Sequence, residues 1–226
     1  MKRIELLDLC RSLLVAFMVV WHALYDLALF GLTDHTFVES TAYHVSACLC
    51  GGGFILIAGI CCRFSRDNLR RGLIVLAAGV AVMAVSLWVG NPVLFGILQL
   101  LGISMLLYGL FGRRLERLPP YVLPIACAVL FPLTLWWTKS TVVDITWVFP
   151  FGFVTDTFYS SDYYPLLPWI FLFLFGTWFG GLLKNKSSRR KIPPALTWPG
   201  RHSLLIYLLH QPVIYCMVYI ISRIQC

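Results

Sequence analysis

The sequence predicts an all-α, multi-pass membrane protein with about seven transmembrane helices, and three observations support this fold class. Of its 226 residues, 59% are hydrophobic and 12% are charged, whereas soluble domains average about half apolar and a quarter charged. The mean hydropathy is correspondingly high, at +0.81. Apolar runs long enough to cross a bilayer as helices recur along the chain, and the basic residues cluster between alternate runs.

The first four predicted helices cover residues 11–31, 42–62, 72–89 and 92–111. The first run starts at Arg11 and stays largely apolar to Phe30. The second is apolar and glycine-rich, and the basic loop CCRFSRDNLRRG follows it. The third and fourth form a hairpin, because the segment Gly90-Asn91-Pro92 is a turn signal between two apolar runs.

The last three predicted helices cover residues 120–137, 165–183 and 201–222, within one domain spanning 1–226. The first of them contains Pro124 and Pro132, which predict a kink. The next carries Gly176 and Gly180, whose spacing favours close helix packing. Segment 138–164 is the one sizeable extramembrane stretch between the predicted helices, and we expect it on the extracytoplasmic side.

The distribution of basic residues predicts the orientation. With the N-terminus in the cytoplasm, all 18 lysines and arginines except Lys139 and Arg223 fall on the cytoplasmic side. This asymmetry predicts an internal N-terminus and an external C-terminus. It also accounts for the net charge of +8 without a nucleic-acid partner, because these side chains face membrane lipids or an anionic ligand.

The eight cysteines lie mostly in apolar segments and lack Cys-x-x-Cys spacing. We interpret them as small packing residues and expect no metal site.

The first predicted helix carries three polar side chains on one face. Arg11 and His22 are eleven residues apart, which is three turns within about 20°, and Asp26 lies one turn beyond His22. With a rise of ~1.5 Å per residue, His22 lies roughly 16 Å from Arg11, near the middle of the membrane. Titratable groups at that depth are costly unless paired, so they mark a candidate functional site. The alternative is that they only join two helices.

The last predicted helix carries His210 and Gln211. His210 is nine residues past Arg201, roughly 14 Å into the membrane, which matches the depth of His22. Two histidines at one depth, on helices that enter from the same side, could line one cavity. Gln99, in the fourth predicted helix, is another polar group at lipid depth, and we expect it to bond to a neighbouring helix.

Two further groups have both a structural and a functional interpretation. The arginines after the second predicted helix fit the positive-inside pattern, and their forked guanidinium groups also suit phosphate. Segment 138–164 combines carboxylates with aromatic rings, which suits an interfacial belt or a lid that binds a sugar or an amine. The residues concerned are Arg63, Arg66, Arg70 and Arg71 in the first group, and Asp162 and Tyr163 in the second.

Several stretches resemble a known family of membrane enzymes. They are Asp8-x-x-Arg11 followed by His22, WHALYDL (21–27), FSRDNLRRG (64–72), FGILQLLGISMLL (95–107), DYYPLLPW (162–169) and GRHSLLIYLLHQP (200–212). Together they are similar to small bacterial members of the heparan-alpha-glucosaminide N-acetyltransferase catalytic-domain family, and the opening motif also resembles the acyltransferase-3 family. Ser12 departs from the pattern, because the family motif usually has glycine there.

The resemblance implies that an acyl group, expected to be acetyl, moves from cytoplasmic acyl-CoA to an acceptor across a bacterial inner membrane. The acceptor would be a hydroxyl or amine on a glycan or small molecule, and no metal is needed. His22 would be the catalytic base with Asp26 orienting its ring. The CoA phosphates would bind Arg11, Arg63, Arg66, Arg70 and Arg71. From the sequence itself, we expect the acceptor to bind His210, Gln211, Gln99, Asp162 and Tyr163.

Two other functions stay open at this point. In a small proton-coupled transporter, His22, Asp26 and His210 would form a proton relay, and in a non-catalytic membrane scaffold they would only pack. Whether His22 or His210 is the base, and whether the chain forms a homo-oligomer, is also left open.

Overall fold

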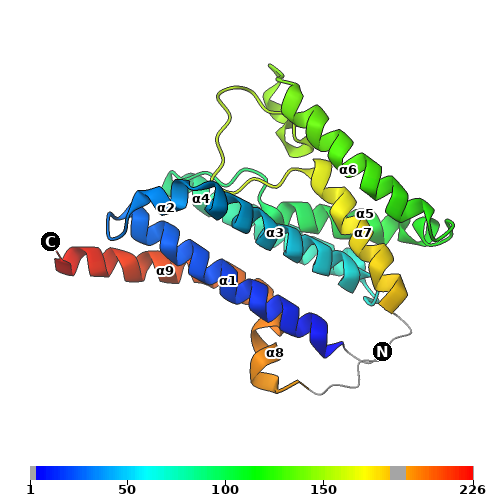
Figure 1. Cartoon of the computed structure of the whole chain (residues 1–226), viewed down its shortest axis with the longest axis horizontal. Helices are drawn as coiled ribbons and strands as arrows, with labels where there is room; N and C mark the ends of the chain where they lie inside the picture. The colour runs from blue at the N-terminus through cyan, green and yellow to red at the C-terminus, as the bar shows by residue number, and fades with distance from the viewer. Residues whose placement is uncertain (1–3, 184–191, 226) are drawn as a thin grey trace. The chain divides into compact units, whose positions relative to one another are not determined.

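The computed structural model of the chain describes residues 4–183 and 192–225, and this part is helical with connecting loops. The all-α prediction is therefore confirmed. Six of the described helices are long and apolar enough to cross a membrane, so the chain is an integral membrane protein. They are α1 (Glu5–Leu29), α3 (Thr41–Cys62), α4 (Asn68–Val89), α6 (Val122–Ser140), α7 (Leu166–Leu183) and α9 (Ser203–Gln225) (Figure 1).

The fourth predicted segment, residues 92–111, also forms a helix, α5 (Ile97–Leu115), but this helix is not among the six. It contains Gln99, and its last turn contains Arg113 and Arg114. These polar and charged residues lower its mean hydropathy. Three short helices were not predicted, because none has an apolar run of spanning length: α2 (His35–Glu39), η1 (Thr146–Phe151) and α8 (Pro194–Arg201).

The first helix begins earlier than predicted. It starts at Glu5 instead of Arg11, so Asp8 and Arg11 lie on the same helix, one turn apart. Because α1 starts earlier, Asp8 and Arg11 are neighbours on one helix face, and both belong to the cluster of charged side chains described below.

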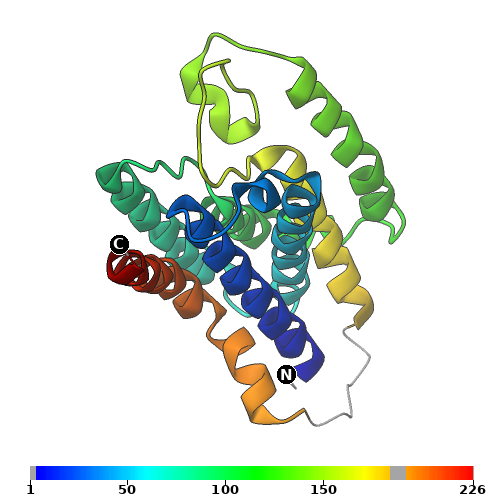
Figure 2. The ribbon, with the colours of Figure 1, turned by 60° about the vertical axis from the view of Figure 1, so that its left-hand side comes forward.

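The chain divides into two compact units, Met1–Phe54 with Ser187–Cys226, and Ile55–Lys186. Helix α3 contributes to both, because the division falls inside it. In the first unit, α1 packs against α8 and α9, and Figure 2 shows α9 passing beside α1. The prediction of one domain over 1–226 stays a prediction, as does the orientation of the termini.

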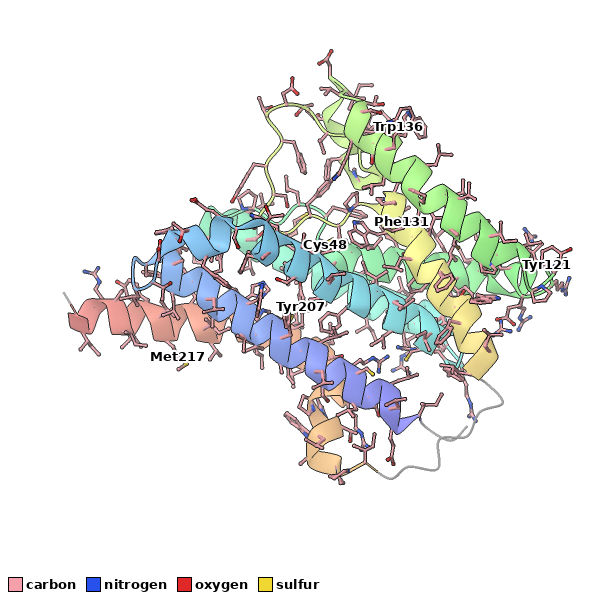
Figure 3. The ribbon with its side chains drawn as sticks, viewed as in Figure 1. Cys48, Tyr121, Phe131, Trp136, Tyr207 and Met217 are labelled. Carbon is pink, nitrogen blue, oxygen red and sulfur yellow. The ribbon has the colours of Figure 1, made fainter. Side chains whose placement is uncertain are left out.

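In the second unit, small residues let helices approach closely, as the spacing of Gly176 and Gly180 predicted. A Cβ atom added to Gly176 would overlap the backbone carbonyl of Leu56 on α3, and one added to Gly180 would lie 2.6 Å from the Ile60 carbonyl. Outward-facing positions are apolar instead: Trp136 of α6 and, in the first unit, Met217 of α9 are exposed (Figure 3). Such residues suit contact with lipid.

Candidate functional site

Two histidine rings meet between α1 and α9 in the first unit. The ring centroids of His22 and His210 are 4.8 Å apart, and the ring planes are nearly perpendicular, at 84°. The stretch of α9 concerned is marked by Tyr207 in Figure 3, one turn before His210. The contact anticipated from the matched depth of the two histidines is therefore present.

Hydrogen bonds within each helix determine which ring nitrogen can accept a proton. The Nδ1 atom of His22 lies 2.9 Å from the Met18 carbonyl oxygen, and that of His210 lies 2.7 Å from the Tyr207 carbonyl oxygen. A carbonyl oxygen only accepts, so each Nδ1 donates, and the Nε2 of each neutral ring keeps a lone pair. The Nε2 atom of His210 is buried and has no hydrogen-bond partner among the described residues.

One turn beyond His22, Asp26 is almost completely buried, with 1% of its surface exposed. The side-chain amide of Gln211 donates to both carboxylate oxygens, at 3.1 Å each. We expected Asp26 to orient the His22 ring, but the structure pairs the carboxylate with Gln211 and the His22 ring with its own helix. Asp26 therefore holds α9 against α1, and Gln211, which we predicted as a substrate contact, is its partner.

A third polar contact lies near the start of α1, whereas the contacts of His22 and Asp26 lie further along the same helix. Asp8, 3% exposed, lies between two guanidinium groups. Its Oδ1 is 3.6 Å from Nη1 of Arg11, and its Oδ2 is 3.5 Å from Nε of Arg201. We did not include Arg201 among the predicted site residues. Its spacing from His210, which resembles the spacing of Arg11 from His22, was the available signal.

The backbones of α1 and α8 are also joined at this point. The Ser12 hydroxyl donates to the Asp8 carbonyl at 3.0 Å and accepts from the Gly200 amide at 2.8 Å. A Cβ atom added to Gly200 would overlap the Asp8 carbonyl. Ser12, which departs from the family pattern, thus provides a specific link to the glycine that precedes Arg201.

In the second unit, Arg63 has a structural partner. Its guanidinium pairs with the Glu116 carboxylate and donates to the Tyr108 hydroxyl at 3.4 Å. The Tyr108 hydroxyl in turn donates to Glu116 at 2.8 Å. The predicted phosphate-binding role of Arg63 therefore competes with an ion pair inside the protein. Among the described residues, no side-chain partner engages Arg66, Arg70 or Arg71.

Gln99 also has a packing role in this unit. Its amide donates to the Gly79 carbonyl at 2.9 Å, and its side chain is buried between α4 and α5. The expected bond to a neighbouring helix is present, whereas the predicted contact with substrate gains no support.

The two candidates from segment 138–164 help to fold that segment. A carboxylate oxygen of Asp162 accepts from the Ile97 amide at 3.4 Å, at the N-terminus of α5. The Tyr163 hydroxyl donates to the Phe149 carbonyl at 2.5 Å, and burial raises the pKa of Tyr163 to about 12. The Tyr163 ring also packs on Phe158, which stacks on Phe149. These contacts favour a structural role for both residues.

Comparison with known families identifies a family to which the chain is similar. The sequence model of the family described as "Heparan-alpha-glucosaminide N-acetyltransferase, catalytic" matches residues 3–212. The match includes the histidine pair, the Asp26–Gln211 contact and the Asp8 cluster. Searches of curated proteins and of solved structures found no match.

Proposed function

We propose that this chain, which belongs to the heparan-alpha-glucosaminide N-acetyltransferase catalytic-domain family, transfers an acetyl group from cytoplasmic acetyl-CoA to an acceptor across the membrane. The acceptor is a hydroxyl or amine, and the family name points to an amino sugar. The observation that carries the proposal is the contact between His22 and His210, with ring centroids 4.8 Å apart in the interior of a membrane protein.

The separation between Arg11 and His22 supports CoA as the donor. Eleven residues of α1 correspond to about 16 Å along the helix axis. An extended pantetheine arm is on the order of 15–20 Å long, roughly the reach of five extended residues. If Arg11 holds a phosphate of CoA at one end, the thioester at the other end of the arm reaches the depth of His22.

We assign the base to His22 because its ring is half-buried, whereas His210 is only 8% exposed. Nε2 of His22 accepts the proton of the acceptor O–H or N–H group as the acceptor atom forms a bond to the thioester carbon. The C–S bond breaks with its electron pair on sulfur, and the proton passes from His22 to the CoA thiolate. His210 lines the same site and keeps an accepting Nε2 beside it.

Asp26 acts in this scheme as a positioning residue. Its two bonds from Gln211 join α1 and α9 one turn from the histidines, so they hold the two rings in register. A buried carboxylate needs such partners, because an unpaired charge in this environment is strongly unfavourable.

Purified protein reconstituted in liposomes would test the proposal. Radiolabelled acetyl-CoA is supplied either outside or inside the liposomes, and glucosamine is the acceptor probe. His22→Ala should abolish transfer while acetyl-CoA binding is retained, because the base acts after the donor has bound. His44→Ala is the matched control, since His44 is an exposed histidine on α3 of the same unit. His210→Ala should lower the rate less than His22→Ala. Undiminished transfer by His22→Ala, or an equal loss in His44→Ala, would refute the assignment.

A further inference from the structure

The cluster of Asp8, Arg11 and Arg201 has an excess of positive charge. One carboxylate, 3% exposed, neutralises one of two guanidinium groups. Each guanidinium has five N–H donors, and Asp8 is the one side-chain partner found for either group among the described residues. Most of these donors are therefore available, and a planar fork of N–H groups matches phosphate oxygens.

The two arginines are held by a rigid support. Ser12 bonds to the backbone of both helices, and Gly200 lies too close to the Asp8 carbonyl for any other residue to fit. Asp8 then fixes one guanidinium on each of its carboxylate oxygens. A ligand that binds here meets two cations already brought together, so little ordering is needed on binding.

Each arginine of the cluster precedes one of the two histidines along the chain. Arg11 lies eleven residues before His22 on α1, and Arg201 lies nine residues before His210 at the end of α8. The separation of Arg11 from His22 corresponds to roughly 16 Å of continuous helix, whereas α8 ends at Arg201 and α9 begins at Ser203. A phosphate held at Arg11 is thus about one pantetheine length from the His22 ring, and the His210 ring contacts that of His22.

We propose that Arg201 and Arg11, bridged by Asp8, form a two-arginine clamp for the phosphate groups of the nucleotide end of CoA. The inference rests on the proposed function and extends it, because it adds α8 to the donor site and gives Asp8 a positioning role. Arg63 belongs to the other unit and is already engaged by Glu116 and Tyr108, so the clamp does not include it.

The test compares two donors, acetyl-CoA and acetyl-pantetheine, which share the thioester arm but differ in the nucleotide phosphates. Arg201→Gln should raise the KM for acetyl-CoA about tenfold, the effect expected for one charge-assisted contact, and leave kcat unchanged. The KM for acetyl-pantetheine should not change. Arg201→Lys should give a smaller rise, because it keeps the charge and loses the fork. Equal effects on both donors would overturn the clamp.

Direct titration with CoA separates this inference from the proposed function, because it needs no transfer. CoA should bind Arg201→Gln about tenfold more weakly than the wild type, and Arg113→Ala, an exposed arginine of α5, should bind like the wild type. If the wild type binds CoA through Arg201 but transfers no acetyl group, the clamp holds and the proposed function fails. If Arg201→Gln binds CoA normally, the clamp is refuted even if transfer occurs.

A lipid headgroup has the same phosphate chemistry, so the titrations are carried out in nanodiscs of neutral phosphatidylcholine and repeated with anionic phosphatidylglycerol. The effect of Arg201→Gln on CoA affinity should be present in both. If it is seen only with phosphatidylglycerol, the arginines bind lipid and the proposal is overturned.

Discussion

A double-mutant cycle on Asp26 and Gln211 would measure how strongly α9 is joined to α1. The first variant, Gln211→Leu, removes both hydrogen bonds to a carboxylate that is 1% exposed. The second, Asp26→Leu, leaves the half-buried amide of Gln211 without its acceptor. The third combines the two changes, so that an apolar pair replaces a polar one.

The structure indicates the size of each effect. A hydrogen bond to a charged group contributes about 1.5–3 kcal/mol, and a buried charge left without partners costs about 3–5 kcal/mol. Gln211→Leu should therefore destabilise the protein by about 3 kcal/mol, or lower Tm by about 6–12 °C for a chain of this size. Asp26→Leu should cost about 2 kcal/mol, because it leaves an unpaired but neutral group. The double variant should cost about 1 kcal/mol, well below the sum of the two single changes.

Thermal unfolding in detergent can be followed with a thiol-reactive dye, because Cys50 is buried in the same unit and becomes reactive when the unit opens. Acetyl transfer should recover together with stability in the double variant, since neither side chain touches Nε2 of His22. Additive losses in the double variant would show that the two side chains are not coupled. Recovery of stability without transfer would assign Asp26 a role in the chemistry, contrary to our reasoning.

Three further predictions concern the second unit. Gly176→Ala should destabilise the protein by about 1–3 kcal/mol, because the new methyl group overlaps the Leu56 carbonyl, whereas Gly181→Ala, 3.5 Å from its nearest neighbour, should be nearly neutral in the same thermal assay. Tyr163→Phe should cost about 1 kcal/mol. Because burial raises the pKa of Tyr163 to about 12, its contribution is complete below pH ~10 and is lost as the pH rises toward 12, which unfolding curves across that range would reveal. Asp162→Ala should lower stability by about 1 kcal/mol through loss of the cap on α5, with KM for the acceptor unchanged.

The spanning helices could be predicted from sequence because hydropathy alone determines them. The short helices α2, η1 and α8 could not, because they depend on local capping and packing. Asp34, for example, starts α2 by accepting the Thr36 amide at 3.0 Å, and nothing in the hydropathy profile marks this residue.

The histidine pair could be anticipated because depth along a helix follows from residue count. Partners across helices were harder to predict. The sequence of α1 alone predicts Asp26, four residues away, as the acceptor for the His22 ring. In the structure the His22 ring bonds to the Met18 carbonyl, and Gln211 donates to the Asp26 carboxylate. Periodicity indicates which residues share a face and does not indicate which helix covers that face.

Charged residues were the least predictable. Arg63 belongs to the positive-inside pattern, and that pattern gives no sign of Glu116, which lies 53 residues further along the chain and neutralises it. Arg201 belongs to the same pattern, yet it lies beside Arg11 because Gly200 allows α8 to contact α1. The similar spacings to a histidine, eleven residues for Arg11 and nine for Arg201, mark these two arginines in the sequence, whereas local charge density does not.

The contacts of α1 with α8 and α9 form three levels along one helix face, and their chemistry differs in a way that suits transfer. The first level is cationic and partly exposed, with Asp8 between two arginines. The second has two accepting imidazoles, and the third is the buried Asp26–Gln211 pair. The first level joins α8 to α1 and the third joins α9 to α1, so contacts to α1 flank the imidazoles on both sides. In the function that we propose, the guanidinium groups of the first level would hold the CoA phosphates, and the imidazoles about 16 Å further along α1 would accept the proton of the acceptor. A scaffold would need neither group.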